Sequence, residues 1–242
     1  MIKLAVSGCR GRMGQRITHL ALNQKDTFTL TTLLEHKNHP EAKGDVNGVA
    51  VSTDNGTLKG ADVLIEFTLP EGTIENLKAC VEHNVKMVIG TTGFKPEQIE
   101  EIKKASEKIP IVFASNMSVG VNVLFKLIEI SGKKLGPSKI NITEAHHIHK
   151  KDAPSGTAKT MAEIAEEASG QKVPTPESIR EGEIIGDHDI IFETEYDTLK
   201  ISHHAKNRDM FAEGALKAAV FLKDKKNGLY DMQQVLGLNE IN

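Results

Sequence analysis

The chain has 242 residues, of which 39% are hydrophobic, 26% are charged and 4% are aromatic, with a formal net charge of -3 and no Trp. This length allows a substantial core in one or two domains, and the charge balance lacks the basic field and stacking rings that nucleic acids require, so we expect no nucleic-acid partner. The two cysteines are far apart and no apolar run approaches the ~20 residues of a membrane span, so we expect a cytoplasmic protein without disulfides or a membrane partner.

The first half of the sequence alternates predicted strands with predicted helices. The segment 2–6 is apolar apart from Lys3 and leads directly into 8-GCRGRMG-14, after which apolar residues recur at helical spacing. A second strand over 28–34 ends at Glu35, so the beginning of the chain predicts a βαβ unit. Further strands are expected at 61–67, 85–90 and 110–114, with helices at 71–83 and 96–108. This alternation predicts a Rossmann-type, doubly wound parallel sheet.

The pattern changes after Asn116, where a smaller α+β domain with a mixed sheet is predicted. Its expected helices are 120–135, with an apolar stripe of Val123, Leu124, Leu127 and Ile128, and one carrying Met161, Ile164, Ala165 and Ala168 that stops near Gly170. Its expected strands are 139–146, 189–195 and 197–205. A final helix over 211–223 is expected to pack on the first domain. We therefore assign residues 1–117 and 209–242 to a dinucleotide-binding domain and residues 118–208 to a second domain.

The glycines of the first turn have the spacing of a dinucleotide-binding motif. Gly8, Gly11 and Gly14 lie between a predicted strand and a predicted helix, where backbone N–H groups and a helix N-terminus can approach a pyrophosphate. Glu35 follows the second strand, at the position expected for an acid that binds a ribose. The alternative is a turn whose glycines serve packing alone, with Glu35 as a solvated acid. Arg10 and Arg12 fit either phosphate contact or solvent exposure.

Two more loops follow strands of the predicted sheet, at the edge where ligands of such sheets bind. They are 90-GTTG-93 and 115-SNMSVG-120. Taken singly, each is also typical of a polar surface loop.

The stretch 144-EAHHIHKKDAPSGTA-158 concentrates histidines and lysines before a predicted helix start. Alternation along the strand places Glu144 and His146 on one face and His147 on the other. Neighbouring imidazole and ammonium groups suit proton delivery. Ser155 is a candidate N-cap, and the backbone N–H groups of Gly156 and Thr157 would form a cradle for a carboxylate or phosphate.

Two other interpretations of this stretch stay open. His146 and His149, together with His203 and His204, are candidate metal ligands, although no Cys or carboxylate spacing completes a familiar set. The cluster is also compatible with a solvated loop before an ordinarily capped helix.

The same stretch resembles the signature of the dihydrodipicolinate reductase family, E-x-H-H-x-x-K-x-D-A-P-S-G-T. Further segments share the resemblance, which covers essentially the whole chain: 8-GCRGRMG-14, 66-EFTLPEGT-73, 90-GTTGF-94, 116-NMSVGVNV-123, 180-REGEIIGDH-188 and 202-SHHAKNRDMFAEGA-215. Members of this family reduce a cyclic, conjugated imine dicarboxylate with NADH or NADPH in lysine and diaminopimelate biosynthesis. The resemblance also implies a homotetramer, formed through the sheets of the second domain. Because the spacing of the histidines matches no familiar ligand set, we expect no metal.

The resemblance assigns roles to individual residues. His146 and Lys150 would be the acid/base pair. The substrate would be bound by His147, Ser155, Gly156 and Thr157. The adenosine and pyrophosphate end of the cofactor would be bound by Gly8, Arg10, Gly11, Arg12, Met13, Gly14, Glu35, His36 and Lys37. The nicotinamide side would be lined by Gly90, Thr91, Thr92, Ala114, Ser115, Asn116 and Met117.

One departure from the family pattern leaves the cofactor preference open. Many relatives have an Arg directly after the ribose-binding acid, where it holds the 2′-phosphate of NADPH, whereas this chain has His36 and then Lys37. Two other functions also remain open: a different Rossmann-type reductase of a small carboxylate, and a nucleotide-sensing regulator without chemistry. The histidine and lysine of the signature argue against the regulator.

Overall fold

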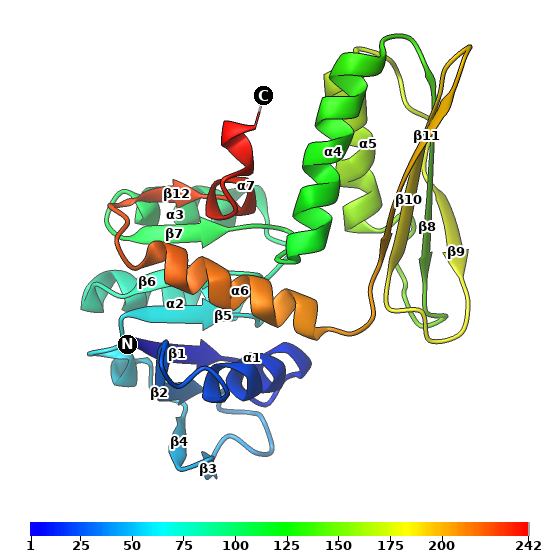
Figure 1. Cartoon of the computed structure of the whole chain (residues 1–242). Coiled ribbons are helices and arrows are strands. Elements are labelled where there is room, and N and C mark those ends of the chain that lie inside the picture. The colour runs from blue at the N-terminus through cyan, green and yellow to red at the C-terminus, as the bar shows by residue number, and fades with distance from the viewer. Residues whose placement is uncertain (242) are drawn as a thin grey trace. The chain divides into compact units, whose positions relative to one another are not determined.

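The structure is a computed structural model that describes residues 1–241 and divides into two compact units. Unit 1 comprises Met1–Ser118 and Phe211–Leu236, and unit 2 comprises Val119–Met210 and the tail from Gly237 on. The expected fold class, a Rossmann-type parallel sheet with a smaller mixed α+β part, is confirmed (Figure 1).

Unit 1 is built on an eight-stranded sheet in the order β12-β7-β6-β5-β1-β2-β4-β3. Its strands are β1 (Ile2–Ser7), β2 (Phe28–Leu34), β3 (Asp45–Val46), β4 (Val49–Ser52), β5 (Val63–Glu66), β6 (Lys86–Ile89), β7 (Pro110–Phe113) and β12 (Gly228–Tyr230). All pairings are parallel except β3 with β4. From β1 the chain turns to one side for β2 and returns to the other side for β5, which makes this the switch point of the sheet.

Helices cover both faces of this sheet. They are α1 (Arg12–Leu22), α2 (Pro70–His83), α3 (Pro96–Ser106), α6 (Asp209–Leu222) and α7 (Met232–Val235). Unit 1 also has a short 3-10 turn at Asn55–Leu58 (η1), and unit 2 has one at Leu238–Glu240 (η2). Ile17 of α1 and Leu216 of α6 join one core cluster, whereas Ile74 of α2 and Ile102 of α3 join the cluster on the opposite face. The final long helix thus packs in unit 1, as its apolar stripe predicted.

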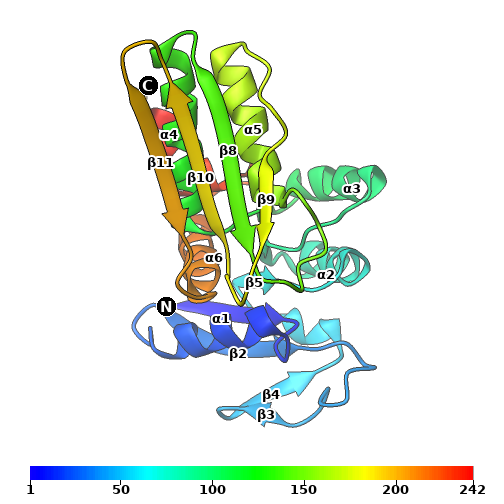
Figure 2. The same ribbon diagram turned by 90° about the vertical axis from the view of Figure 1, so that its right-hand side faces the viewer.

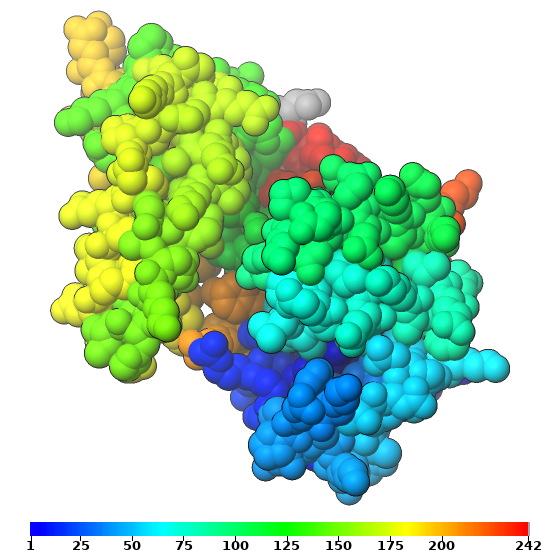
Figure 3. Space-filling view, turned by 180° about the vertical axis from the view of Figure 1, so that it is seen from behind, coloured from blue at the N-terminus to red at the C-terminus, as the bar shows by residue number. Residues whose placement is uncertain are grey.

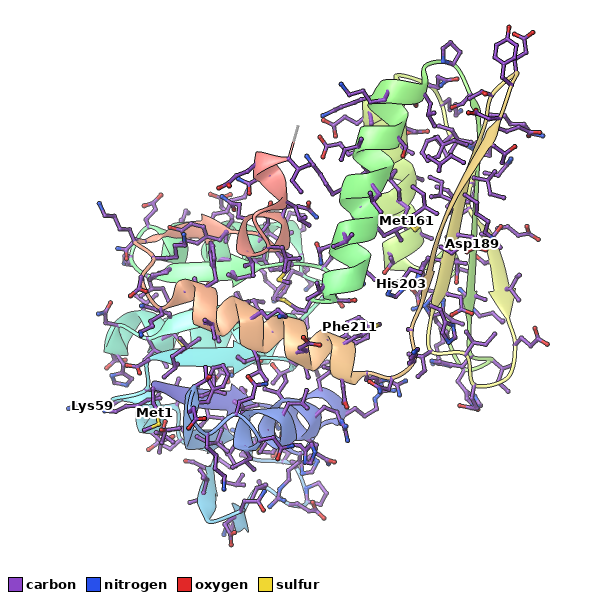
Figure 4. The ribbon with its side chains drawn as sticks, in the orientation of Figure 1. Met1, Lys59, Met161, Asp189, His203 and Phe211 are labelled. Atoms are coloured by element: carbon purple, nitrogen blue, oxygen red, sulfur yellow. The ribbon has the colours of Figure 1, made fainter. Side chains whose placement is uncertain are left out.

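Unit 2 is a four-stranded mixed sheet with two helices on one face (Figures 1 and 2). The order is β11-β10-β8-β9, with β8 (Lys139–His146), β9 (Glu177–Arg180), β10 (Asp187–Glu193) and β11 (Thr198–His204). Helices α4 (Val119–Leu135) and α5 (Gly156–Ser169) bury Ile128 and Met161 against Ile142 and Phe192 of the sheet. Met161 and His203 lie on the helix side of this sheet (Figure 4). The alternation of β8 thereby sets which side chains face inward.

The stripe predicted for α4 is partly wrong. Leu124 and Ile128 are buried, but Val123 and Leu127 are exposed, and their places in the core are taken by Val121 and Phe125. Both sets have helical spacing, so the packing partners α5 and β11 decide between them. None of the helices described by the structure is long and apolar enough to cross a membrane.

Candidate functional site

The cofactor residues expected from the sequence gather along one edge of the unit 1 sheet. Strands β1, β2, β6 and β7 run parallel, so the loops that follow them begin at the same edge. The glycine turn follows β1, Glu35 follows β2, Gly90 follows β6 and Ala114 follows β7. These positions come from four separate segments of the chain and form one candidate cofactor site.

The glycine turn is packed so closely that two of its glycines cannot carry a side chain. Gly8 has a φ of +67°, and a Cβ atom there would lie 2.9 Å from the carbonyl oxygen of Phe67. A Cβ atom on Gly14 would lie 2.1 Å from the Gly8 carbonyl oxygen. Gly11 donates its N–H to that same oxygen at 2.9 Å and begins α1 without a side-chain cap. The bare start of α1 fits the phosphates of a dinucleotide.

Glu35 and its neighbours form the part of this edge that was predicted to bind the adenosine. The Glu35 carboxylate accepts the backbone N–H groups of Arg10 and His36, each at 2.9 Å. The Arg10 guanidinium donates to the carbonyl oxygens of Glu41 and Lys43. Its side chain is therefore committed to the loop after β2. Lys37 and Arg12 are exposed, and Met13 packs against the core.

In the loops after β6 and β7, several predicted cofactor residues have side chains that contact the protein itself, which leaves their backbones for a ligand. Thr91 is buried, and its hydroxyl accepts the N–H of Thr68 and the hydroxyl of Thr73, both at 3.0 Å. Met117 is buried in the core. The Asn116 side chain accepts the N–H of Ser118 at 2.8 Å. By contrast, the side chains of Thr92 and Ser115 are exposed.

Beneath this edge lies a polar group that sequence reasoning missed. Glu66 is fully buried and accepts a hydrogen bond of 2.6 Å from Asn76, which also donates to Ser7, while the Thr68 hydroxyl bonds the other carboxyl oxygen. Burial raises the pKa of Glu66, although these hydrogen bonds lower it in part. The phenyl ring of Phe67, the next residue, fills the space where Gly90 has no side chain. Thr68 is a local partner of Glu66, but Asn76 lies 10 residues away and Ser7 lies on another strand, so no local spacing indicates the whole network.

The second candidate site lies on the inner face of the unit 2 sheet. Glu144 and His146 share this face of β8, as the alternation predicted, and the strand ends at His146. His146 Nδ1 lies 2.5 Å from Glu144 Oε2, and Arg180 of β9 donates to both carboxylate oxygens, at 2.9 and 2.7 Å. His188 of β10 places its ring against His146, with centroids 5.2 Å apart at 77°. Arg180 and His188 belong to a segment quoted for the family resemblance, but sequence reasoning gave them no role.

The buried setting controls the protonation of these groups. Burial alone would raise the pKa of Glu144, but hydrogen bonds from Arg180, His146 and the Ser155 N–H outweigh it and lower the pKa to about 2. Burial lowers the pKa of His146, which the hydrogen bond and charge of Glu144 partly restore. Burial, followed by the charges of His146 and His203, lowers the pKa of His188 to about 4. Glu144 is thus a carboxylate at neutral pH, and His188 is neutral.

Lys150 and His147 lie in the loop that follows β8. The Lys150 ammonium forms a 2.9 Å ion pair with Asp152, and the Lys150 N–H donates to the carbonyl oxygen of His147 at 3.1 Å. Nδ1 of His147 is buried without a hydrogen-bond partner. The His147 ring faces that of His149 at 6.1 Å. The loop therefore keeps the predicted proton donor Lys150 and the predicted substrate residue His147 in one short segment.

Helix α5 begins directly after this loop, with Ser155 as the N-cap. The Ser155 hydroxyl accepts the N–H of Ala158 at 3.2 Å, which confirms the predicted cap. Ser155 is buried, and its own N–H donates to Glu144 at 3.1 Å. Gly156 has neither a positive φ nor any protein atom within 4 Å of a Cβ built there. The protein's own packing therefore does not explain this glycine. The atoms of α5, coloured yellow-green in Figure 3, lie on the surface of unit 2.

The metal interpretation finds no support in the part of the chain that the structure describes. There, no three His, Cys, Asp or Glu side chains are grouped to hold a metal ion. His204 instead pairs with Asp187 on the outer face of the sheet, and His149 lies 4.0 Å from Glu183.

Comparisons with known proteins match both halves of the chain. Residues 2–117 match the family described as "Dihydrodipicolinate reductase, N-terminus", and residues 120–236 match "Dihydrodipicolinate reductase, C-terminus". A 4-hydroxy-tetrahydrodipicolinate reductase of Polynucleobacter necessarius is 43% identical over 267 residues, covering 99% of this chain and 100% of the relative. The enzyme of that name from Syntrophotalea carbinolica is 42% identical, covering 98% and 100%.

Solved structures agree with this match. The dipicolinate-bound dihydrodipicolinate reductase from Paenisporosarcina sp. TG-14 has a TM-score of 0.84 at 26% identity, covering 97% of this chain and 98% of that chain. A probable dehydrogenase from Thermotoga maritima has a TM-score of 0.64 at 13% identity, covering 97% and 92%, and shares the fold.

Proposed function

The chain belongs to the dihydrodipicolinate reductase family, and we propose that it uses the two candidate sites to reduce 4-hydroxy-tetrahydrodipicolinate in lysine and diaminopimelate biosynthesis. It is an NAD(P)H-dependent oxidoreductase, as the resemblance predicted. In this proposal, residues 1–117 and 209–242 bind the cofactor, and residues 118–208 bind the substrate. The observation that carries it is the convergence of His146, the Lys150 loop and the start of α5 on one side of the unit 2 sheet.

The proton-handling step belongs to His146 and Lys150. Reduction of a conjugated imine adds one hydride and one proton, so a proton donor has to lie beside the bound substrate. His146 is held by Glu144 through Nδ1 and turns its Nε2 toward Gly186, where a Cβ atom would lie only 3.0 Å away. Lys150 carries an ammonium group paired with Asp152. These two residues form the proposed acid/base pair.

We assign the binding of the substrate carboxylates to the start of α5 and to His147. A helix N-terminus favours an anion because its first N–H groups have no partner within the helix. Gly156 lets a carboxylate approach those N–H groups, which gives a reason for the glycine where internal packing gives none. We assign Gly156 and Thr157 to this cradle, with Ser155 as its cap. His147, with an unpaired buried nitrogen, completes the proposed substrate residues.

We assign the binding of NADH or NADPH to the edge of the unit 1 sheet. When bound, the cofactor supplies the hydride. The start of α1 and the turn from Gly8 to Gly14 would hold its pyrophosphate, and Glu35 would accept the ribose hydroxyl groups. Thr92 and Ser115, both exposed, and the backbones of Gly90 and Thr91 would line the nicotinamide.

Assembly and location complete the proposal. The unit 2 sheet carries its helices on one face, and the other face presents Ile179, Ile191 and the Asp189–Lys200 ion pair of 2.8 Å. We assign this outer face to a homotetramer interface, which light scattering after gel filtration can test by molar mass.

A cytoplasmic location suits the free, buried thiols of Cys9 and Cys80.

The decisive experiment follows NADH and NADPH oxidation by absorbance, with the freshly generated synthase product as substrate. Turnover that depends on this substrate is expected. Turnover only with another small carboxylate would favour a different reductase of the same fold. Tight cofactor binding without any turnover would favour a nucleotide-sensing regulator.

A further inference from the structure

Glu144 contacts His146 and accepts hydrogen bonds from four nitrogens of three residues. Its side chain is fully buried, and its carboxylate accepts from His146, from both terminal nitrogens of Arg180 and from the backbone N–H of Ser155. A buried carboxylate is costly unless it is paired and hydrogen-bonded, and here it is both. The arrangement is therefore stable only with all of its partners in place.

The carboxylate determines which nitrogen of His146 carries a hydrogen. An ionised carboxylate only accepts hydrogen bonds, so the Nδ1 atom at 2.5 Å must be the donor. In the neutral ring, Nε2 is then the atom without hydrogen, and it lies so close to Gly186 that a Cβ atom on that residue would be only 3.0 Å away. Nε2 is consequently the nitrogen that exchanges a proton with a ligand.

Arg180 extends the same network to the second proton donor. Besides its two bonds to Glu144, it donates to the carbonyl oxygen of Asp152 at 2.6 Å. The Asp152 carboxylate in turn pairs with Lys150 at 2.9 Å. A continuous set of contacts therefore joins His146 to the segment that carries Lys150.

We propose that Glu144 and Arg180 are a positioning pair, which fixes the tautomer of His146 and ties it to the Lys150 loop and the start of α5. The inference rests on the proposed function for its effect on turnover. It assigns no contact with substrate to either residue, because both act through the groups that they hold. The two residues lie on different strands, β8 and β9, so the parallel pairing of His146 with Arg180 brings them together.

Loss of the Glu144 charge has a predictable electrostatic effect. The charged and titratable groups that face His146 are Glu144 from β8, Arg180 from β9, His188 from β10 and Lys150 from the loop. Of these, only Glu144 raises the pKa of His146, whereas burial, Lys150 and Arg180 lower it. Without the carboxylate, the pKa of His146 falls further.

The test compares Glu144→Gln and Arg180→Lys with wild type and with Glu163→Gln, an exposed position on α5. We expect kcat to fall by at least about tenfold in both test variants, as when an orienting carboxylate is removed from a catalytic histidine. The limb of the kcat–pH profile that reports His146 should move to lower pH in Glu144→Gln. NADH affinity by calorimetry and the control variant should stay at wild-type values.

A second readout does not depend on turnover. Nitrogen-15 NMR of the labelled imidazole should report a single tautomer, hydrogen on Nδ1, in the wild type and a mixture in Glu144→Gln. If that variant fails to fold, Arg180→Lys, which keeps the charge and leaves the Glu144 carboxylate in place, carries the test through kcat alone, and an unchanged kcat would then overturn the positioning pair. An unchanged tautomer together with an unshifted pH profile would overturn the positioning pair. Absence of turnover in the wild type would instead refute the proposed function and leave the tautomer measurement to decide.

Discussion

The carbonyl oxygen of Gly8 lies 2.1 Å from the place that a Cβ atom would take on Gly14. Gly14→Ala therefore forces backbone atoms of the turn apart, which we expect to cost about 1–3 kcal/mol of stability and to weaken NADH binding. Gly11→Ala is the matched comparison, because its Cβ atom would lie 3.1 Å from the same oxygen and needs only a small shift. Thermal unfolding and calorimetric NADH titration measure both effects. Equal losses of thermal stability in the two variants would contradict this account of the turn.

For Gly156, in contrast to Gly14, we expect a substitution to leave the stability of the protein intact. No protein atom lies within 4 Å of a Cβ built there, so Gly156→Ala should leave the thermal stability unchanged or slightly higher. A methyl group at the start of α5 would nevertheless obstruct a carboxylate, so we expect weaker binding of substrate and of dicarboxylate inhibitors than of NADH. Calorimetric titration with each ligand checks the difference, with Lys159→Ala, exposed on the same helix, as control. A loss of affinity for NADH as large as for the dicarboxylate would remove the argument for a local cradle.

The proposed proton donors give a kinetic expectation. His146→Gln and Lys150→Ala should each lower kcat by roughly 10²-fold or more, the size of a general acid–base contribution, with little change in NADH affinity. Lys151→Ala is the control, because its side chain is exposed beside Lys150. Steady-state rates at saturating substrate decide, and near-normal turnover in both variants would refute the assignment.

The sequence predicts local elements well and long-range contacts poorly. The strands 28–34 and 139–146 have the predicted bounds because strict apolar patterning and turn residues delimit them. The four-residue strand β9 was missed, since its pairing with β8 lies more than 30 residues away. The Glu144–Arg180 contact depends on that pairing, so its detection required the fold. Likewise, the glycine motif indicated a phosphate site, but the buried Glu66 beneath it left no periodic signal.

Glu66 gives a prediction about stability and pH. Because burial raises its pKa above the ordinary 4.5, the folded protein keeps a proton that the unfolded chain releases. Stability should therefore fall as the pH rises from about 4.5 to the pKa in the folded state, with a slope of at most about 1.4 kcal/mol per pH unit. Glu66→Gln removes this dependence, although its NH₂ group adds a constant cost against Asn76 or Thr68.

Urea unfolding at a series of pH values measures the effect. The difference in unfolding free energy between Glu66→Gln and wild type should move in favour of the variant as the pH rises through that window. Glu75→Gln, on the exposed face of α2, should show no such trend. Parallel curves for wild type and Glu66→Gln would mean that Glu66 is ionised in the folded protein.

The last prediction concerns the choice between NADH and NADPH. The Glu35 carboxylate suits the two ribose hydroxyls of NADH and repels a 2′-phosphate unless a cation offsets its charge. Arg10 is committed to the carbonyl oxygens of Glu41 and Lys43, and His36 Nδ1 accepts the N–H of Asn38 at 3.3 Å. Lys37 is exposed in the same loop, so it is the cation that we expect to bind the 2′-phosphate.

A lysine offers a mobile point charge without the planar fork of arginine, so its hold on a phosphate is looser and more sensitive to salt. We therefore expect both cofactors to be used with no more than a modest preference, and Lys37→Ala to lower kcat/KM for NADPH more than for NADH. The measurement compares the two kcat/KM values in wild type, Lys37→Ala and Lys43→Ala at low and high salt. If the NADPH to NADH ratio is the same in wild type and Lys37→Ala at every salt concentration, Lys37 only faces solvent, and the specificity of the enzyme is set by Glu35 alone.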